Sequence, residues 1–146
     1  MRNIIEDQLT QEEKTKAENL ITQLETIFID KLSALTEKQR QDYKAINEKN
    51  KLFVNKVWDY RRHSSHLSSP DVDWQEFEND YKARVFVENL LGRITSLAYR
   101  LESTKIMHDY DNYQDSLNDY AYSQYSKGAG NPGYTEKVAE LKLFFA

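Results

Sequence analysis

The chain has 146 residues, which fits one domain and is long enough to bury a core. Apolar residues make up 39% and charged residues 30%, with only 4 Gly and 2 Pro, so we expect long helices and few loops. The absence of Cys excludes disulfides, thiol catalysis and Cys-ligated zinc.

The net charge of −4 is unevenly distributed along the chain. Residues 37–66 hold 8 basic and 4 acidic groups, whereas residues 67–126 hold 5 basic and 11 acidic groups. We interpret this as a basic segment that packs beside acidic segments of the same chain. The alternative is a basic face for an anionic partner.

The first half of the chain predicts two helices. Residues 1–9 are expected to be a flexible N-terminus, without the apolar core of a signal peptide. A capping box that starts at Thr10 opens a helix over 11–35, and a second one at Thr36 opens a helix over 37–63. The apolar stripes could also continue as one helix over 11–63, but the pattern favours the break.

A serine-rich loop with Pro70 precedes the most apolar stretch of the chain, which predicts a helix over 74–102. Two stripes follow from its spacing: Trp74, Phe77, Tyr81 and Val85 on one side, and Val87, Leu90, Leu91, Ile94, Leu97, Ala98 and Leu101 on roughly the other. No Pro or Gly interrupts residues 74–91, so we prefer one helix with two sets of neighbours. Either stripe could be a bundle core or a surface for another chain.

The last part of the chain predicts two further helices. Ser103 and Thr104 are a plausible cap for a tyrosine-rich helix over 104–126, whose apolar residues are offset from the preceding stripe. A Gly/Pro loop over 127–134 leads to a short helix over 135–146, which must dock on its own bundle or on a partner. The expected fold is all-α: a single domain over 1–146, with an up-and-down four-helix bundle and a short additional C-terminal helix.

No residue pattern predicts a catalytic, cofactor-binding or metal site. His63, His66 and Asp59 could present metal ligands, but a solvated helix end explains them better, and the chain has no Glu-x-x-His pair. The GAGNPG loop lacks the Lys-Ser/Thr of a phosphate loop. The basic and aromatic residues Lys51, Lys56, Trp58, Tyr60, Arg61 and Arg62 could meet nucleic acid. Trp58 and Tyr60 instead fit the core, so we expect no nucleic-acid partner. Because no catalytic pattern is present, we do not expect an enzyme either.

Exposed aromatic residues are the expected partner contacts, because tyrosine and other large aromatic side chains are enriched at interfaces. The candidates are Trp74, Phe77, Tyr81, Tyr122, Tyr125, Phe144 and Phe145. We therefore expect a non-catalytic protein–protein interaction module, such as a small adaptor or assembly subunit. The alternatives are a small acidic inhibitor or immunity protein that neutralises a toxin or enzyme, and a ligand- or metal-binding helical bundle.

The expected partner is another protein, or a second copy of the chain. No apolar run approaches the roughly 20 residues of a membrane span, so no membrane partner is expected. Because no cofactor-binding motif is present, no cofactor is expected either. A cytoplasmic location follows as the expectation.

Overall fold

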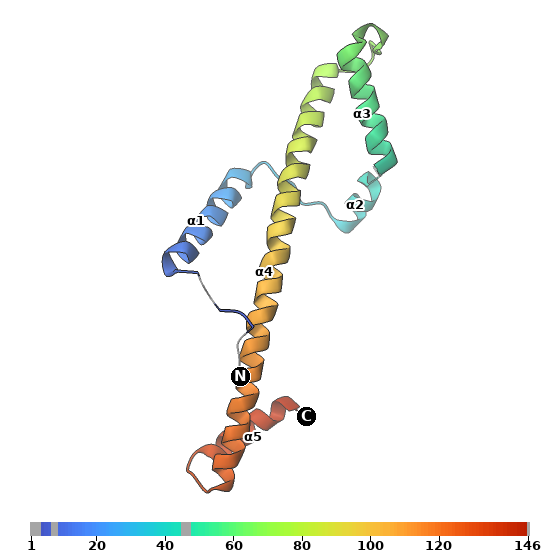
Figure 1. The fold of residues 1–146 in the computed structure, drawn as a ribbon. Helices are drawn as coiled ribbons and strands as arrows, with labels where there is room; N and C mark the ends of the chain where they lie inside the picture. Colours follow the sequence, from blue (N-terminus) through green and yellow to red (C-terminus); the bar gives the residue numbers. More distant parts are fainter. Residues whose placement is uncertain (1–3, 7–8, 45–47, 146) are drawn as a thin grey trace. The chain divides into compact units, whose positions relative to one another are not determined.

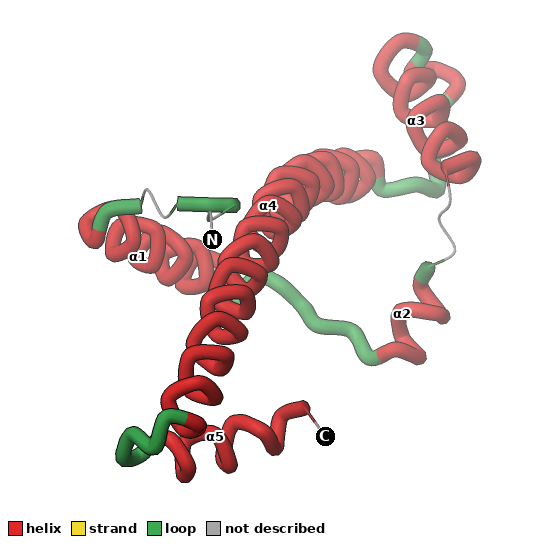
Figure 2. Tube along the Cα trace, turned by 60° about the horizontal axis from the view of Figure 1, so that its bottom comes forward, coloured by secondary structure: helices red, strands yellow, loops and turns green. Residues whose placement is uncertain are grey.

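The computed structural model describes residues 4–6, 9–44 and 48–145. These residues form helices and loops and contain no strand, which confirms the all-α class (Figure 2). The α-helices are α1 (Gln11–Phe28), α2 (Glu37–Tyr43), α3 (Glu48–His63), α4 (Trp74–Gly128) and α5 (Tyr134–Lys142), with 3-10 turns η1 (Ser65–Leu67) and η2 (Leu143–Phe145). Two compact units divide the chain: residues 1–8 with 85–146, and residues 9–84. We call them the C-terminal unit and the N-terminal unit.

Both predicted capping boxes are present and set the starts of α1 and α2. The Thr10 hydroxyl accepts a hydrogen bond from the backbone of Glu13, and the Glu13 side chain accepts one from the backbone of Thr10. Thr36 and Gln39 do the same at α2. The chain therefore breaks before Thr36, as the sequence favoured, and residues 11–63 are not one helix.

The first helices are shorter than predicted. α1 ends at Phe28 rather than at residue 35, and α2 ends at Tyr43 because Lys44 leaves the helical region with φ −81° and ψ 49°. The predicted helix over 37–63 therefore consists of α2 and α3. Its residues 45–47 lie outside the described part of the chain.

The N-terminal unit places α3 beside the beginning of α4 (Figure 1). Trp58 of α3 is 8% exposed and packs on the rings of Phe77 and Tyr81 from α4. Asp73 caps α4, because its carboxylate accepts the backbone N–H of Glu76 at 3.1 Å. This cap follows directly on the serine-rich loop that the sequence predicted.

The predicted break at residue 103 is wrong, because α4 is one helix of 55 residues. The hydroxyls of Ser103 and Thr104 do not cap a helix start; they donate to the carbonyls of Tyr99 and Arg100, one turn earlier, at 3.0 and 2.8 Å. Both side chains therefore behave as residues of a helix interior. An up-and-down four-helix bundle is not confirmed, since two of its four expected helices are parts of α4.

In the C-terminal unit, α5 folds back on the end of α4. Gly130 and Gly133 adopt positive φ angles of 81° and 89°, which the turn between the two helices requires. Ser123 of α4 is fully buried, and Val138 of α5 is buried with 6% exposure. The short C-terminal helix therefore docks within its own chain.

Candidate interaction surface

The N-terminal unit contains an aromatic cluster that includes two of the predicted partner contacts, Phe77 and Tyr81. Trp58 stacks on Phe77 and Tyr81 with ring centroids 5.7 and 5.6 Å apart. The Tyr81 hydroxyl donates to Asn55 Oδ1 at 3.0 Å, and the Arg84 guanidinium lies 5.1 Å from the Tyr81 ring centroid. Phe77 and Tyr81 are thus half-buried parts of the unit's core, which limits what they can offer to a partner.

Trp74, the third predicted contact in this unit, forms the wall of a hollow. Its indole N–H donates to the Ser69 carbonyl at 2.9 Å, and the Arg61 guanidinium lies 5.1 Å from the centre of its ring system. The hollow has a volume of about 500 Å³. Most of its lining is apolar: Phe53, Val57, Leu67, Val72 and Trp74.

The predicted contacts in the C-terminal unit are more exposed. Tyr125 is 74% and Phe144 is 84% exposed. Tyr122 makes an edge contact with Tyr134 at 6.0 Å between ring centroids, and Phe145 stacks on Tyr120 at 5.0 Å. The Tyr122–Tyr134 and Tyr120–Phe145 contacts hold α5 and η2 against α4, whereas Tyr125 and Phe144 remain at the surface.

The residues with metal-binding or catalytic chemistry are dispersed. His63 and His66 are exposed, and Asp59 pairs with Arg62 at 2.7 Å. Across residues 4–6, 9–44 and 48–145, no three His, Asp or Glu side chains gather in a group that could hold a metal ion.

The hydrogen bond to Asp109 raises the pKa of Lys105, and the two residues form an i,i+4 pair at the surface of α4. No described helix has both the length and the apolar character to cross a membrane.

Three buried polar residues of α4 were missed by the sequence prediction. The Asp111 carboxylate, 8% exposed, accepts the backbone N–H groups of Ile4 and Ile5 at distances of 2.9 to 3.1 Å. Ser123 and Ser126, three residues apart, lie buried near the end of α4, the part of the helix on which α5 folds back (Figure 1). Their spacing places two small side chains on one helix face, which is a sequence signal for close approach of a second helix. Nothing in the sequence indicates that the carboxylate of Asp111 binds the N-terminal backbone.

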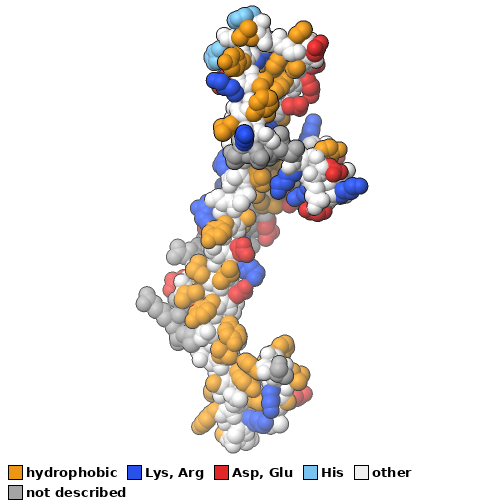
Figure 3. Space-filling view, turned by 90° about the vertical axis from the view of Figure 1, so that its right-hand side faces the viewer, with side chains coloured by type: hydrophobic (Ala, Val, Ile, Leu, Met, Phe, Trp, Pro, Cys, Tyr) orange, Lys and Arg blue, Asp and Glu red, His pale blue; other side chains and the backbone are white. Residues whose placement is uncertain are grey.

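The C-terminal unit also has an exposed apolar stripe on α4. We call it the α4 stripe and define it as Val87, Leu90, Leu91, Ile94, Leu97, Ala98 and Leu101. Leu90 is half-buried and the other six are exposed; among the large side chains the exposed fraction runs from 45% at Ile94 to 62% at Leu101. Figure 3 shows hydrophobic side chains at the surface of this part of α4. The helix was predicted to change neighbours along its length, but the described residues of its unit leave this stripe uncovered.

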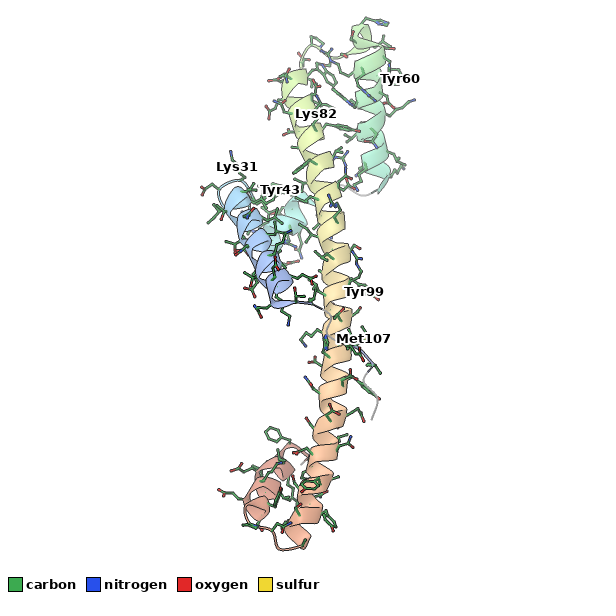
Figure 4. The ribbon with its side chains drawn as sticks, turned by 60° about the vertical axis from the view of Figure 1, so that its left-hand side comes forward. Lys31, Tyr43, Tyr60, Lys82, Tyr99 and Met107 are labelled. Atoms are coloured by element: carbon green, nitrogen blue, oxygen red, sulfur yellow. The ribbon has the colours of Figure 1, made fainter. Side chains whose placement is uncertain are left out.

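The α4 stripe occupies one side of the helix only. Successive helical residues advance by about 100°, so the stripe spans about 120° of the circumference. Tyr99 lies outside it and projects from α4, with 71% exposure (Figure 4). The neighbouring positions on that outer side are mostly polar or small, at Asn89, Gly92, Ser96 and Ser103, with Val85 as the half-buried apolar exception. An apolar face backed by a polar face is typical of a helix that binds one neighbour.

No family model matches the chain, and neither the curated proteins nor the solved structures contain a significant match.

Proposed function

We propose that the protein is a non-catalytic protein–protein interaction module that works as an assembly subunit, and that the α4 stripe is its binding surface. One observation carries this proposal: five of the stripe's large apolar side chains are at least 45% exposed in the unit that contains them. Exposed contiguous apolar surface marks interaction sites in soluble proteins. Leucine, isoleucine and valine in a row on one helix face are an arrangement that a second helix can cover.

The α4 stripe supports the proposal better than the predicted aromatic contacts do. Phe77 and Tyr81 are engaged by Trp58, and Phe145 by Tyr120, so their rings already have intramolecular neighbours. Burying the α4 stripe requires no rearrangement of its own unit. Because burial of apolar area is favourable at roughly 25 cal/mol per Å², the exposed stripe offers binding energy that the unit does not use.

The experiment compares two lysine substitutions on opposite faces of α4. Ile94→Lys puts a charge in the centre of the α4 stripe, and Tyr99→Lys puts the same charge on the outer face. Both positions are exposed, so both variants should keep the thermal midpoint of the parent within about 2 °C. Tagged protein is then used in pull-downs from the native host, and its mass is measured by light scattering.

We expect Ile94→Lys to lose a bound protein or to lower the assembled mass, while Tyr99→Lys retains both. If the two variants bring down the same proteins as the parent and have the same mass, the α4 stripe is not the binding surface and the proposal fails.

A further inference from the structure

We propose that the apolar hollow beside Trp74 is a binding site for a small amphipathic anion, a molecule with an apolar body and one carboxylate at its end. The site lies wholly within the N-terminal unit, so it is separate from the α4 stripe and independent of the function proposed above. Three features carry the inference: the size and lining of the hollow, the polar hollow that adjoins it, and two cations without an acidic partner.

The apolar hollow is formed where α3 turns into α4 (Figure 1). Phe53, Val57 and Tyr60 of α3 follow one another in steps of four and three residues, so they lie on one face of that helix. Leu67 of η1 and Trp74 of α4 line it from the other elements. Its volume of about 500 Å³ falls within the roughly 300–1,000 Å³ of pockets that hold small molecules, and such pockets are mostly apolar with a few polar groups.

The walls of the apolar hollow are held in place before any ligand binds. The Trp74 indole N–H donates to the Ser69 carbonyl at 2.9 Å, and its ring lies 5.2 Å from the Phe77 ring between centroids. In the turn after α3, the Leu67 N–H donates to the Ser64 carbonyl at 2.9 Å. Because these walls are already ordered, a ligand that enters the hollow loses little of its binding energy to ordering the protein.

A second, polar hollow of about 330 Å³ adjoins the apolar one. Its lining consists of Lys56, Asp59, Tyr60, His63 and Ser64. Lys56 and Tyr60 line both hollows, so the two meet along these side chains. The ammonium, phenol, imidazole and serine hydroxyl can all donate hydrogen bonds, whereas the carboxylate of Asp59 pairs with Arg62 at 2.7 Å. An apolar hollow next to a hollow of donors fits a ligand with an apolar body and an anionic end.

The charge of the apolar hollow also favours an anion. Lys56 and Arg61 line it, and none of its described lining residues is acidic. Lys56 Nζ lies 5.5 Å from the Tyr60 ring centroid, and the Arg61 guanidinium lies 5.1 Å from the Trp74 ring. Neither cation forms an ion pair with a carboxylate in the described part of the chain. Unbalanced positive charge at a cavity attracts an anion and repels a cation of the same shape.

Decanoate, a straight-chain carboxylate, is the probe, and the full chain is titrated with it below the concentration at which it forms micelles. Tryptophan fluorescence follows binding, because Trp74 lines the hollow, and calorimetry gives the stoichiometry. We expect one decanoate per chain, bound several-fold more tightly than the neutral 1-decanol. Each buried methylene is worth about fourfold in affinity, so octanoate, two methylenes shorter, should bind about tenfold more weakly.

Two pairs of matched variants locate the ligand. Leu67→Gln and Leu101→Gln change leucines that are 65% and 62% exposed, one in the hollow and one in the α4 stripe. Only Leu67→Gln should weaken decanoate binding, by about fivefold or more. Lys56→Gln should weaken it about threefold and reduce the preference for decanoate over decanol. Lys82→Gln, which removes an exposed lysine paired with Glu78 in the same unit, should change neither quantity.

The absence of saturable decanoate binding to the parent chain would overturn the site. Equal affinity for decanoate and decanol, with Lys56→Gln no weaker than Lys82→Gln, would overturn the anionic end of the ligand. A larger loss in Leu101→Gln than in Leu67→Gln would place the chain of the ligand on the α4 stripe instead. Binding to phosphatidylglycerol vesicles without binding to free decanoate would overturn a free ligand in favour of a lipid surface. Ile94→Lys should bind decanoate like the parent, so failure of this proposal and failure of the proposed function are seen separately.

Discussion

Replacement of Trp58 by Ala tests whether one ring holds α3 on α4. Trp58 is one of two apolar side chains in the described residues that are buried, and its neighbours Phe77 and Tyr81 come from α4. A buried aromatic side chain removes about 200 Å² from water, which at roughly 25 cal/mol per Å² is an upper bound of about 5 kcal/mol. Large-to-small substitutions of buried Trp cost about 3–5 kcal/mol. We expect Trp58→Ala to lower the free energy of unfolding of the N-terminal unit by about 4 kcal/mol.

Urea unfolding followed by tryptophan fluorescence measures this loss in the correct unit. The chain has two Trp, and Trp74 lies in the same unit as Trp58, so its emission still reports on that unit in the variant. Tyr60→Ala is the matched control, because Tyr60 is an aromatic residue of α3 that is 52% exposed. It should cost less than about 1 kcal/mol. Equal unfolding midpoints for Trp58→Ala and Tyr60→Ala would refute the argument that the Trp58 cluster is the core of the unit.

Three further predictions concern the C-terminal unit. Asp111→Asn removes a carboxylate that accepts the Ile4 and Ile5 N–H groups, so hydrogen exchange of the Ile4 amide should become about tenfold faster or more; an unchanged rate contradicts the contact. Ser123→Leu enlarges a fully buried residue and should cost about 1–3 kcal/mol, seen as faster proteolysis of the loop before α5, and unaltered cleavage argues against close packing there. Gly133→Ala forces a side chain into a left-handed conformation and should cost about 1–2 kcal/mol in thermal unfolding. Gly92→Ala, in the open interior of α4, should instead gain about 0.5–1 kcal/mol; a loss at both glycines would contradict the assignment of Gly133 to a special backbone conformation.

Local sequence signals predicted the helix starts well. Thr10 and Thr36 cap α1 and α2 as expected, because a capping box depends only on residues within one turn. The loop after α4 was equally clear, since Gly130 and Gly133 supply positive φ angles. These features are fixed by short-range geometry, which a sequence displays directly.

The break predicted at Ser103 failed for a physical reason. A change in the direction of the apolar face has two explanations: the helix ends, or the helix continues and meets different neighbours. Serine and threonine fit both, because a hydroxyl can cap a helix start or donate to the carbonyl one turn earlier. The structure shows the second case at Ser103 and Thr104. Only knowledge of the neighbours separates the two, and sequence periodicity does not contain it.

The candidate site was predicted in part. The two-sided character of residues 74–101 was read from spacing, and continuity of the helix through both stripes is confirmed. The aromatic residues chosen as partner contacts were selected by residue type, which does not distinguish a ring that stacks on Trp58 from a ring in water. Tyr81 and Tyr125 illustrate the difference: Tyr81 is half-buried in the aromatic cluster, whereas Tyr125 is 74% exposed.

The uncovered middle of α4 follows from how the neighbours of this helix are distributed. α3 covers the beginning of α4 through Trp58, and α5 covers its end through the contacts of Tyr134 with Tyr122 and of Lys137 with Asp119. Each cover is made by a segment that joins α4 through a short connection, so each can reach only the adjacent end. The α4 stripe begins 13 residues after the start of α4 and ends 27 residues before its end, so its residues lie several turns from both connections. Within its own unit, the apolar middle of α4 is therefore left to a neighbour from outside that unit, and this is the physical basis of the proposed binding surface.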